Sequence, residues 1–127
     1  MGMHFFFASS IKEAYECNFY ELYIEDEIDY FIGEIKEYID IISKGSADIM
    51  LTIDPYSHTL LSKNQIEKLL SLGKILLDEE LIEHLKYLRL FEKYNIEQKE
   101  FIDFANNLIN VCIKAIKENK TIISLGD

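Results

Sequence analysis

Apolar residues repeat with helical spacing over several segments of this chain, and this repeat limits the folds open to it. The clearest stripe lies between residues 25 and 44, and its members are Ile28, Phe31, Ile32, Ile35, Tyr38, Ile39 and Ile42. Positions three and four apart share one face of an α-helix, so this segment must bury that face against another element. Glu25, Asp26 and Glu27 complement the dipole of the first turn, and Gly45 is typical of a helix end. The pattern predicts a helix over 25–44.

Two further helices are predicted in the middle of the chain. Ser62 and Gln65 form a capping box ahead of an apolar stripe, which indicates a helix over 62–77. A second stripe of the same period predicts a helix over 79–94. The sequence does not say whether these two helices are continuous or broken near Asp78.

A long helix is predicted after Asn95, ending near Asn119. Its apolar face is formed by Phe101, Phe104, Ala105, Leu108, Ile109, Cys112, Ala115 and Ile116. One uninterrupted face over this length is typical of a helix that lies across a hydrophobic core.

Short apolar runs bounded by turn residues predict three strands, over 4–7, 49–53 and 121–125. The middle run leads into Asp54-Pro55-Tyr56-Ser57, which has the residues of a tight turn. Residues 11–24 fit a helical spacing and a strand alternation about equally, so we expect an irregular, aromatic-rich connection there.

The predicted elements follow the order strand, helix, strand, three helices, strand. Three short strands need helices to cover them, so we expect an α+β fold with a small sheet of about three short strands packed against three to four amphipathic helices. The connection from Phe7 to Ile49 is long enough for a right-handed crossover, which would make the first two strands a parallel pair. A chain of 127 residues has the size of a single domain, here 1–127.

Acidic charge is concentrated in the first part of the chain. Residues 1–54 contain twelve carboxylates and three lysines, so they account for −9 of a net charge of −10. A negative field of this kind attracts basic partners and repels nucleic acid and anionic membranes. We therefore expect neither direct nucleic-acid binding nor membrane binding.

The sequence also has no secretory leader pattern and no apolar run of membrane-spanning length. Cys17 and Cys112 lie far apart without a CxxC spacing, and in an intracellular protein such residues are usually small buried hydrophobic residues. These observations predict a soluble, cytoplasmic protein.

Catalytic and metal-binding patterns are weak. Asp54, Ser57 and His58 are the residue types of a hydrolase triad, but five consecutive turn residues rarely converge as a triad must. His4 and His84, like His58, lie in separate elements without metal-ligand spacing. We expect no enzyme activity, no metal and no cofactor, and a protein that works by being bound.

Residues 51–59, followed by Asn64-Gln65, resemble a pattern in bacterial immunity proteins encoded beside contact-dependent growth inhibition and other polymorphic toxins. Some of these proteins carry a strand, an Ile-Asp-Pro-Tyr turn ending in Thr, and then Asn and Gln leading into a helix. Residues 121–127 look like the closing strand and Gly-Asp of the same group, and Asn18-Phe19-Tyr20 is a looser likeness. Ser57-His58 departs from the Gly-Asp that often stands in this turn.

The resemblance implies an immunity protein that binds a cognate toxin C-terminal domain and masks its active site or substrate-binding surface. Many such toxins are nucleases, including nucleases that act on tRNA, and nucleases tend to be basic because they hold phosphates. Complementary charge would speed association, and buried anchors would slow dissociation. The residues expected to supply the field are Glu25, Asp26, Glu27, Asp29, Glu34, Glu37 and Asp40, and the candidate anchors are Tyr20, Tyr23, Tyr30 and Tyr56.

Two other functions remain open at this stage. An acidic domain could imitate nucleic acid and inhibit a host DNA- or RNA-binding protein, without a paired toxin. A small enzyme that uses Asp54, Ser57 and His58 is the third hypothesis, and it ranks last because the sequence has no G-x-S-x-G nucleophile elbow.

Overall fold

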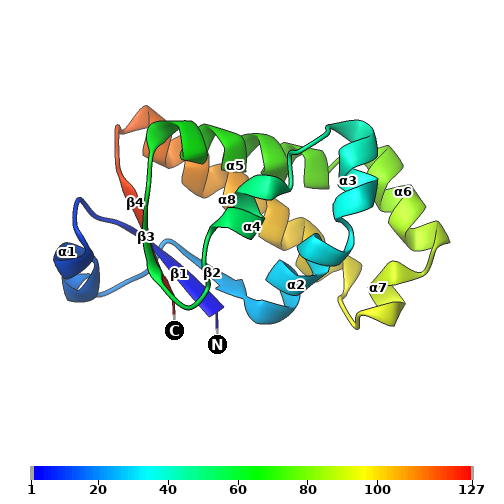
Figure 1. Ribbon diagram of the computed structural model, residues 1–127, viewed down its shortest axis with the longest axis horizontal. Helices are drawn as coiled ribbons and strands as arrows, with labels where there is room; N and C mark the ends of the chain where they lie inside the picture. Colours follow the sequence, from blue (N-terminus) through cyan, green and yellow to red (C-terminus); the bar gives the residue numbers. More distant parts are fainter. Residues whose placement is uncertain (1, 127) are drawn as a thin grey trace.

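The computed structural model describes residues 2–126. Within that range it contains eight helices and a four-stranded antiparallel sheet, and so the predicted α+β class is confirmed (Figure 1). Asp127, the last residue of the likeness at the C-terminus, lies outside the described residues. In chain order the elements are β1 Gly2–Phe7, α1 Ile11–Glu16, β2 Leu22–Glu25, α2 Asp26–Glu34, α3 Lys36–Ile42, α4 Asp48–Thr52, β3 His58–Leu61, α5 Lys63–Leu76, α6 Glu79–Tyr87, α7 Leu90–Lys93, α8 Gln98–Lys117 and β4 Ile122–Gly126.

The sheet has the strand order β2-β1-β4-β3, and every neighbouring pair is antiparallel. Phe5 of β1 lies opposite Leu22 of β2 on one side and opposite Ser124 of β4 on the other. The expected parallel pair between 4–7 and 49–53 is therefore wrong. The second strand of that expected pair, residues 49–53, is not a strand.

Residues 49–53 lie instead in and just after the short helix α4. Ile49, Met50 and Ile53 are buried, while Leu51 and Thr52 are exposed, which is a helical rather than an alternating pattern. A continuous apolar run of five residues carries no periodicity that separates a buried strand from a short helix. The missing strand is β3, which begins directly after the Asp54–Ser57 turn.

Residues 11–24 are more regular than expected. Ser10 caps α1, because its side chain accepts a hydrogen bond of 3.1 Å from the Glu13 backbone N–H. After a turn, Leu22–Glu25 forms the edge strand β2. The helical spacing is thus real over Ile11–Glu16, whereas the alternation of Tyr15, Cys17 and Phe19 does not mark the strand, which begins later at Leu22. The expected irregular connection is confined to residues 17–21.

The predicted helix over 25–44 is present as two helices, α2 and α3, separated at Ile35. Gly33 lowers the helical propensity just before the break. The apolar stripe continues across it, because Ile32, Ile35 and Ile39 are all fully buried. Gly45 has a left-handed φ of +82°, but α3 ends earlier, at Ile42 with Ser43 as its C-cap, so Gly45 lies in the following turn and not at the expected cap position.

The remaining helices follow the sequence closely. The capping box of Ser62 and Gln65 is present at the start of α5. The helices of 62–77 and 79–94 are not continuous, because the Asp78 side chain caps a new helix by accepting from the Leu81 N–H at 3.1 Å. The second of them is itself divided into α6 and α7 at Arg89, whose φ is +57°. The long helix and the last strand are α8 and β4.

Figure 1 shows how these elements are arranged. The two longest helices, α5 and α8, run side by side along the molecule. The sheet and α1 lie at one end, and α2, α3, α6 and α7 lie at the other. We call these the sheet end and the helical end. One large apolar core, with Phe5, Leu69 and Phe31 among its fully buried members, extends through both ends.

Candidate functional site

An aromatic cluster inside the helical end positions the candidate site. Phe31 of α2 lies 5.5 Å from Phe91 of α7 and 5.7 Å from Phe101 of α8, measured between ring centroids. The ring of Tyr94, which ends α7, meets Phe31 edge to face at 5.8 Å. These contacts fix α2 against α7, so the polar ends of both helices reach the surface together.

Above this cluster, tyrosines and carboxylates form one continuous surface. Tyr30 is 62 % exposed, and its ring lies 6.2 Å from that of Tyr94. The Tyr94 hydroxyl donates a hydrogen bond of 3.3 Å to a carboxylate oxygen of Glu34. Tyr30 and Glu34 are four positions apart in α2 and hence neighbours on its surface. With Glu37 and Tyr38 of α3, these three residues form what we call the acidic tyrosine face.

Two hydroxyl groups of this face, those of Tyr30 and Tyr38, have raised pKa values. A hydrogen bond to Glu34 and the negative charge of that carboxylate raise the pKa of Tyr30 above its ordinary value. Partial burial, followed by the charge of Glu37, raises the pKa of Tyr38. The face therefore presents two kinds of group side by side. Its carboxylates can pair with cations, and its tyrosines offer flat apolar rings.

A lysine of the chain itself already lies against one ring of this face. The Nζ atom of Lys93 lies over the Tyr94 ring, 5.4 Å from its centroid. This is the cation–π geometry that a lysine or arginine of a partner would adopt on an exposed tyrosine. Carboxylates next to aromatic rings thus form a surface suited to basic side chains.

The other predicted acidic residues are distributed around the face. Glu25, Asp26 and Glu27 are exposed at the junction of β2 and α2. Asp29 is half-buried, and its Oδ1 atom is buried without a hydrogen-bond partner. Burial, and then the nearby charge of Asp26, raise the pKa of Asp29.

Asp40 has a structural role. Its carboxylate lies 2.9 Å from the Lys36 Nζ atom and accepts a hydrogen bond of 3.0 Å from the Gly45 N–H. These two contacts lower the pKa of Asp40. A carboxylate that ties the end of α3 to the following turn is less available to a partner than Glu34 or Glu37.

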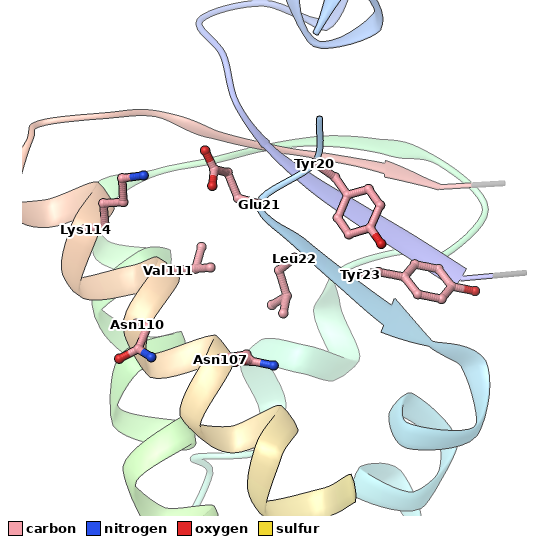
Figure 2. Close-up of a pocket in the computed structure, with 8 residues that line it drawn as sticks. All are labelled: Tyr20, Glu21, Leu22, Tyr23, Asn107, Asn110, Val111 and Lys114. Atoms are coloured by element: carbon pink, nitrogen blue, oxygen red, sulfur yellow. The ribbon is translucent and has the colours of Figure 1, made fainter. Parts of the chain in front are cut away.

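The tyrosines predicted at positions 20 and 23 lie at the sheet end, next to a groove of about 520 Å³ between β2 and α8 (Figure 2). Leu22 points across this groove toward α8, whereas the rings of Tyr20 and Tyr23 lie together on the other side of β2. Their centroids are 6.2 Å apart, and the His4 ring stacks on Tyr23 at 4.5 Å. The groove mixes charges and amides, since Glu21, Lys114, Asn107 and Asn110 all line it.

The residues of the suggested hydrolase triad are engaged separately. The His58 Nε2 atom forms a hydrogen bond of 2.8 Å with the Tyr15 hydroxyl. The Asp54 carboxylate instead accepts from the Tyr56 N–H at 2.8 Å and so stabilises its own turn. Tyr56, a predicted anchor, is exposed on that turn, away from the other three predicted tyrosines in the sequence.

Each histidine of the chain packs against a tyrosine rather than against another metal-ligating group. His4 contacts Tyr23, His58 contacts Tyr15, and the ring of His84 lies 5.1 Å from Tyr38. Within residues 2–126, no group of three or more His, Cys, Asp or Glu side chains is arranged to hold a metal ion.

Both cysteines are free thiols. Cys112 is fully buried in α8, and burial raises the pKa of its thiol to about 12. Cys17 is partly exposed, and its Sγ atom donates to the Glu13 carbonyl at 3.3 Å.

Sequence reasoning missed two members of the face. Tyr38 belongs to the apolar stripe of 25–44 and was counted there as a core residue, but it is only partly buried. Tyr94 is far from Glu34 in the sequence, so only the fold brings the two together. Among the predicted residues, the structure places Tyr30, Glu34 and Glu37 on one surface and leaves Tyr20, Tyr23 and Tyr56 elsewhere.

No protein-family model matches the chain, and no curated protein and no solved structure matches it. Across the described residues, no helix combines the length and the apolar character needed to cross a membrane. The function must therefore be inferred from the chain's own surfaces.

Proposed function

We propose that this chain is an immunity protein that binds a cognate toxin domain and neutralises it by covering its active site or substrate-binding surface. The observation that carries the proposal is the acidic tyrosine face, which combines Glu34 and Glu37 with three tyrosines on one rigid surface. The likeness of residues 51–59 to immunity proteins supports the same conclusion.

A basic nuclease is the toxin class that suits this face best. A nuclease holds the phosphates of its substrate with lysine and arginine side chains. Carboxylates can pair with those cations, and tyrosine rings can take the place of stacked bases. Once the immunity protein occupies the active-site cleft of the nuclease, the substrate cannot enter, whether it is tRNA or another nucleic acid. Neutralisation is proposed to take place in the cytoplasm, where these substrates lie.

The charge also favours fast capture of the toxin. Electrostatic complementarity raises association rates by one to three orders of magnitude at low salt. The aromatic members of the face would then slow dissociation, because tyrosines are frequent hot spots of protein interfaces.

The test is co-expression of this chain with the toxin domain encoded beside its gene. We expect growth to be rescued and a complex to co-purify. The double variant Glu34→Lys/Glu37→Lys should lose rescue, since it places two cations against a basic partner. The matched control is Glu16→Lys/Glu21→Lys, which makes the same change in net charge at exposed positions of the sheet end.

Three outcomes would contradict the proposal. The first is a failure of the unmodified chain to rescue growth or to bind the toxin domain. The second is equal loss of rescue in both double variants, which would show that net charge rather than this face matters. The third is purification with a host DNA- or RNA-binding protein in place of the toxin, as expected of an acidic nucleic-acid mimic.

A further inference from the structure

Two adjacent isoleucines at the end of α3 face the surface instead of the core. Ile41 is 78 % exposed and Ile42 is 38 % exposed, while Ile35 and Ile39 supply the buried side of the helix pair. Ile41 therefore contributes almost nothing to the burial of apolar area on folding. Burying such a side chain against a partner would remove its apolar surface from water, which is the main favourable term in most protein association.

These isoleucines border a slot between α3 and α6. Buried Leu81 lies among its lining residues, and Tyr38 and His84 contribute aromatic rings whose centroids are 5.1 Å apart. The slot has a volume of about 220 Å³, smaller than the ~300–1,000 Å³ of a typical small-molecule site. A space of this size suits an inserted side chain of a protein partner.

The charged residues around the slot favour a partner segment that carries a basic residue next to the inserted side chain. Among the residues of 2–126 that line the slot, Glu80 carries a negative charge and none is a lysine or arginine. Glu37 of the acidic tyrosine face precedes Tyr38 in α3, and its negative charge acts on the Tyr38 hydroxyl. A segment that enters the slot therefore meets Glu80 in the lining and has Glu37 nearby.

We propose that the α3–α6 slot receives one large apolar side chain of the toxin domain, and that a lysine or arginine next to it in the toxin sequence pairs with Glu80 or Glu37. This inference rests on the proposed function and assigns it an apolar anchor beside the charged face. Tyr38 belongs to both surfaces, so a partner can occupy the slot and the face together.

A second copy of this chain is a poor occupant. The slot lies on the end of the molecule whose four helices α2, α3, α6 and α7 contain ten carboxylates and three lysines. Two such ends would repel each other on approach, whereas a basic domain would be attracted.

The experiment measures binding of the purified toxin domain to the full chain and to Ile41→Arg. The variant should raise the Kd by about 30-fold or more, the effect of losing one hot-spot residue. Its circular dichroism spectrum and thermal unfolding should match those of the unmodified chain, because the Ile41 side chain is exposed. Ile113→Arg is the matched control, since it makes the same substitution at a 45 % exposed isoleucine of α8. It should change the Kd by less than about threefold, as expected outside the contact.

A photo-cross-linking residue at position 41 tests the occupant directly. The cross-linked toxin peptide should contain a large apolar residue with lysine or arginine beside it. A peptide without these residues, or cross-linking of the chain to a second copy of itself, would overturn the proposal.

The outcomes also separate this inference from the function it rests on. If Ile41→Arg binds the toxin as tightly as the unmodified chain while Glu34→Lys/Glu37→Lys does not, the slot is not an anchor site but the immunity function stands. If the unmodified chain fails to bind the toxin domain, both the slot inference and the proposed immunity function are contradicted.

Discussion

The two ends of this molecule use tyrosine in different ways. At the helical end, Tyr30, Tyr38 and Tyr94 lie beside carboxylates, and the four helices α2, α3, α6 and α7 have a net charge of −7. At the sheet end, Tyr15 and Tyr23 contact histidines, and the four strands with α1 have a net charge of −2. We therefore place the proposed basic partner at the helical end, where the tyrosines have acidic neighbours.

The ends also differ in how they are held together. The sheet end is built on backbone hydrogen bonds between its strands. The helical end depends on side-chain packing, with Phe31 at the centre of contacts to α7 and α8. Because one apolar core extends through both ends, the binding surface gains rigidity from the sheet as well as from its own helices.

The largest expected effect tests this shared core. Phe31→Ala at the helical end and Phe5→Ala at the sheet end each remove a fully buried ring and should lower the free energy of unfolding by about 3–5 kcal/mol. Both should unfold in a single cooperative transition. Urea denaturation followed by circular dichroism and tyrosine fluorescence measures this.

Two separate transitions in either variant would mean that the sheet end and the helical end are independent units. The conclusion that they share one core would then be wrong. The exposed substitution Leu60→Ala in β3 is a control, since it should change the free energy of unfolding by less than about 1 kcal/mol.

The next effect concerns the exposed tyrosines. Tyr30→Ala should raise the dissociation rate of the toxin complex about tenfold or more, because it removes a candidate anchor of the acidic tyrosine face. Tyr20→Ala, at a similarly exposed residue of the sheet end, should leave that rate nearly unchanged. Surface plasmon resonance distinguishes the two. A larger effect from Tyr20 would move the binding surface to the sheet end.

The smallest effects concern two carboxylates within the helical end whose pKa values are shifted in opposite directions. The pKa of Asp29 is raised, so its ionised form lowers stability at pH 7, and this cost disappears as the pH falls through its folded pKa. Asp29→Asn should therefore stabilise the protein at pH 7, by less than about 1 kcal/mol because solvent screens a half-exposed group.

The ionised form of Asp40 has the opposite effect on stability. Its lowered pKa means that it stabilises the fold at a pH above its unfolded value of about 3.8, and that this contribution is lost as the pH falls through its folded pKa. Asp40→Asn should lower the melting temperature at pH 7 and have little effect near pH 2. Melting temperatures of both variants, measured between pH 7 and pH 2, test these opposite effects. If Asp29→Asn and Asp40→Asn shift the melting temperature at pH 7 in the same direction, the opposite pKa shifts are contradicted.

The long amphipathic segments were predictable because their periodicity repeats over several turns. The faces of α5 and α8, together with the Ser62–Gln65 cap, follow from spacing and capping residues alone. Residues 49–53 were misread for the opposite reason, since five apolar residues are too few to show a period. The expected parallel pair was wrong as a result, and the four-stranded order needs two strands that were not predicted, β2 from Leu22 and β3 from His58.

The candidate site was predictable only where it is local. Tyr30 and Glu34 lie four residues apart on one helix, and the sequence therefore indicates that they are neighbours. Ile41 stands outside the apolar stripe of 25–44, so its exposure agrees with the helical period, whereas the slot beside it depends on how α6 packs against α3. Tyr94 joins Glu34 only through the packing of Phe31 against α7, a contact that no local pattern encodes.

The burial of Cys112 makes this chain a convenient reporter of its own binding. A thiol with a pKa of about 12 inside α8 does not react with maleimides at neutral pH, so a fluorescent label would attach at Cys17 alone. Cys17 directly follows α1, which lies at the sheet end in Figure 1, whereas the helices of the acidic tyrosine face lie at the helical end. Energy transfer from a labelled toxin domain to Cys17 would then measure, without any mutation, at which end of the molecule the toxin is bound.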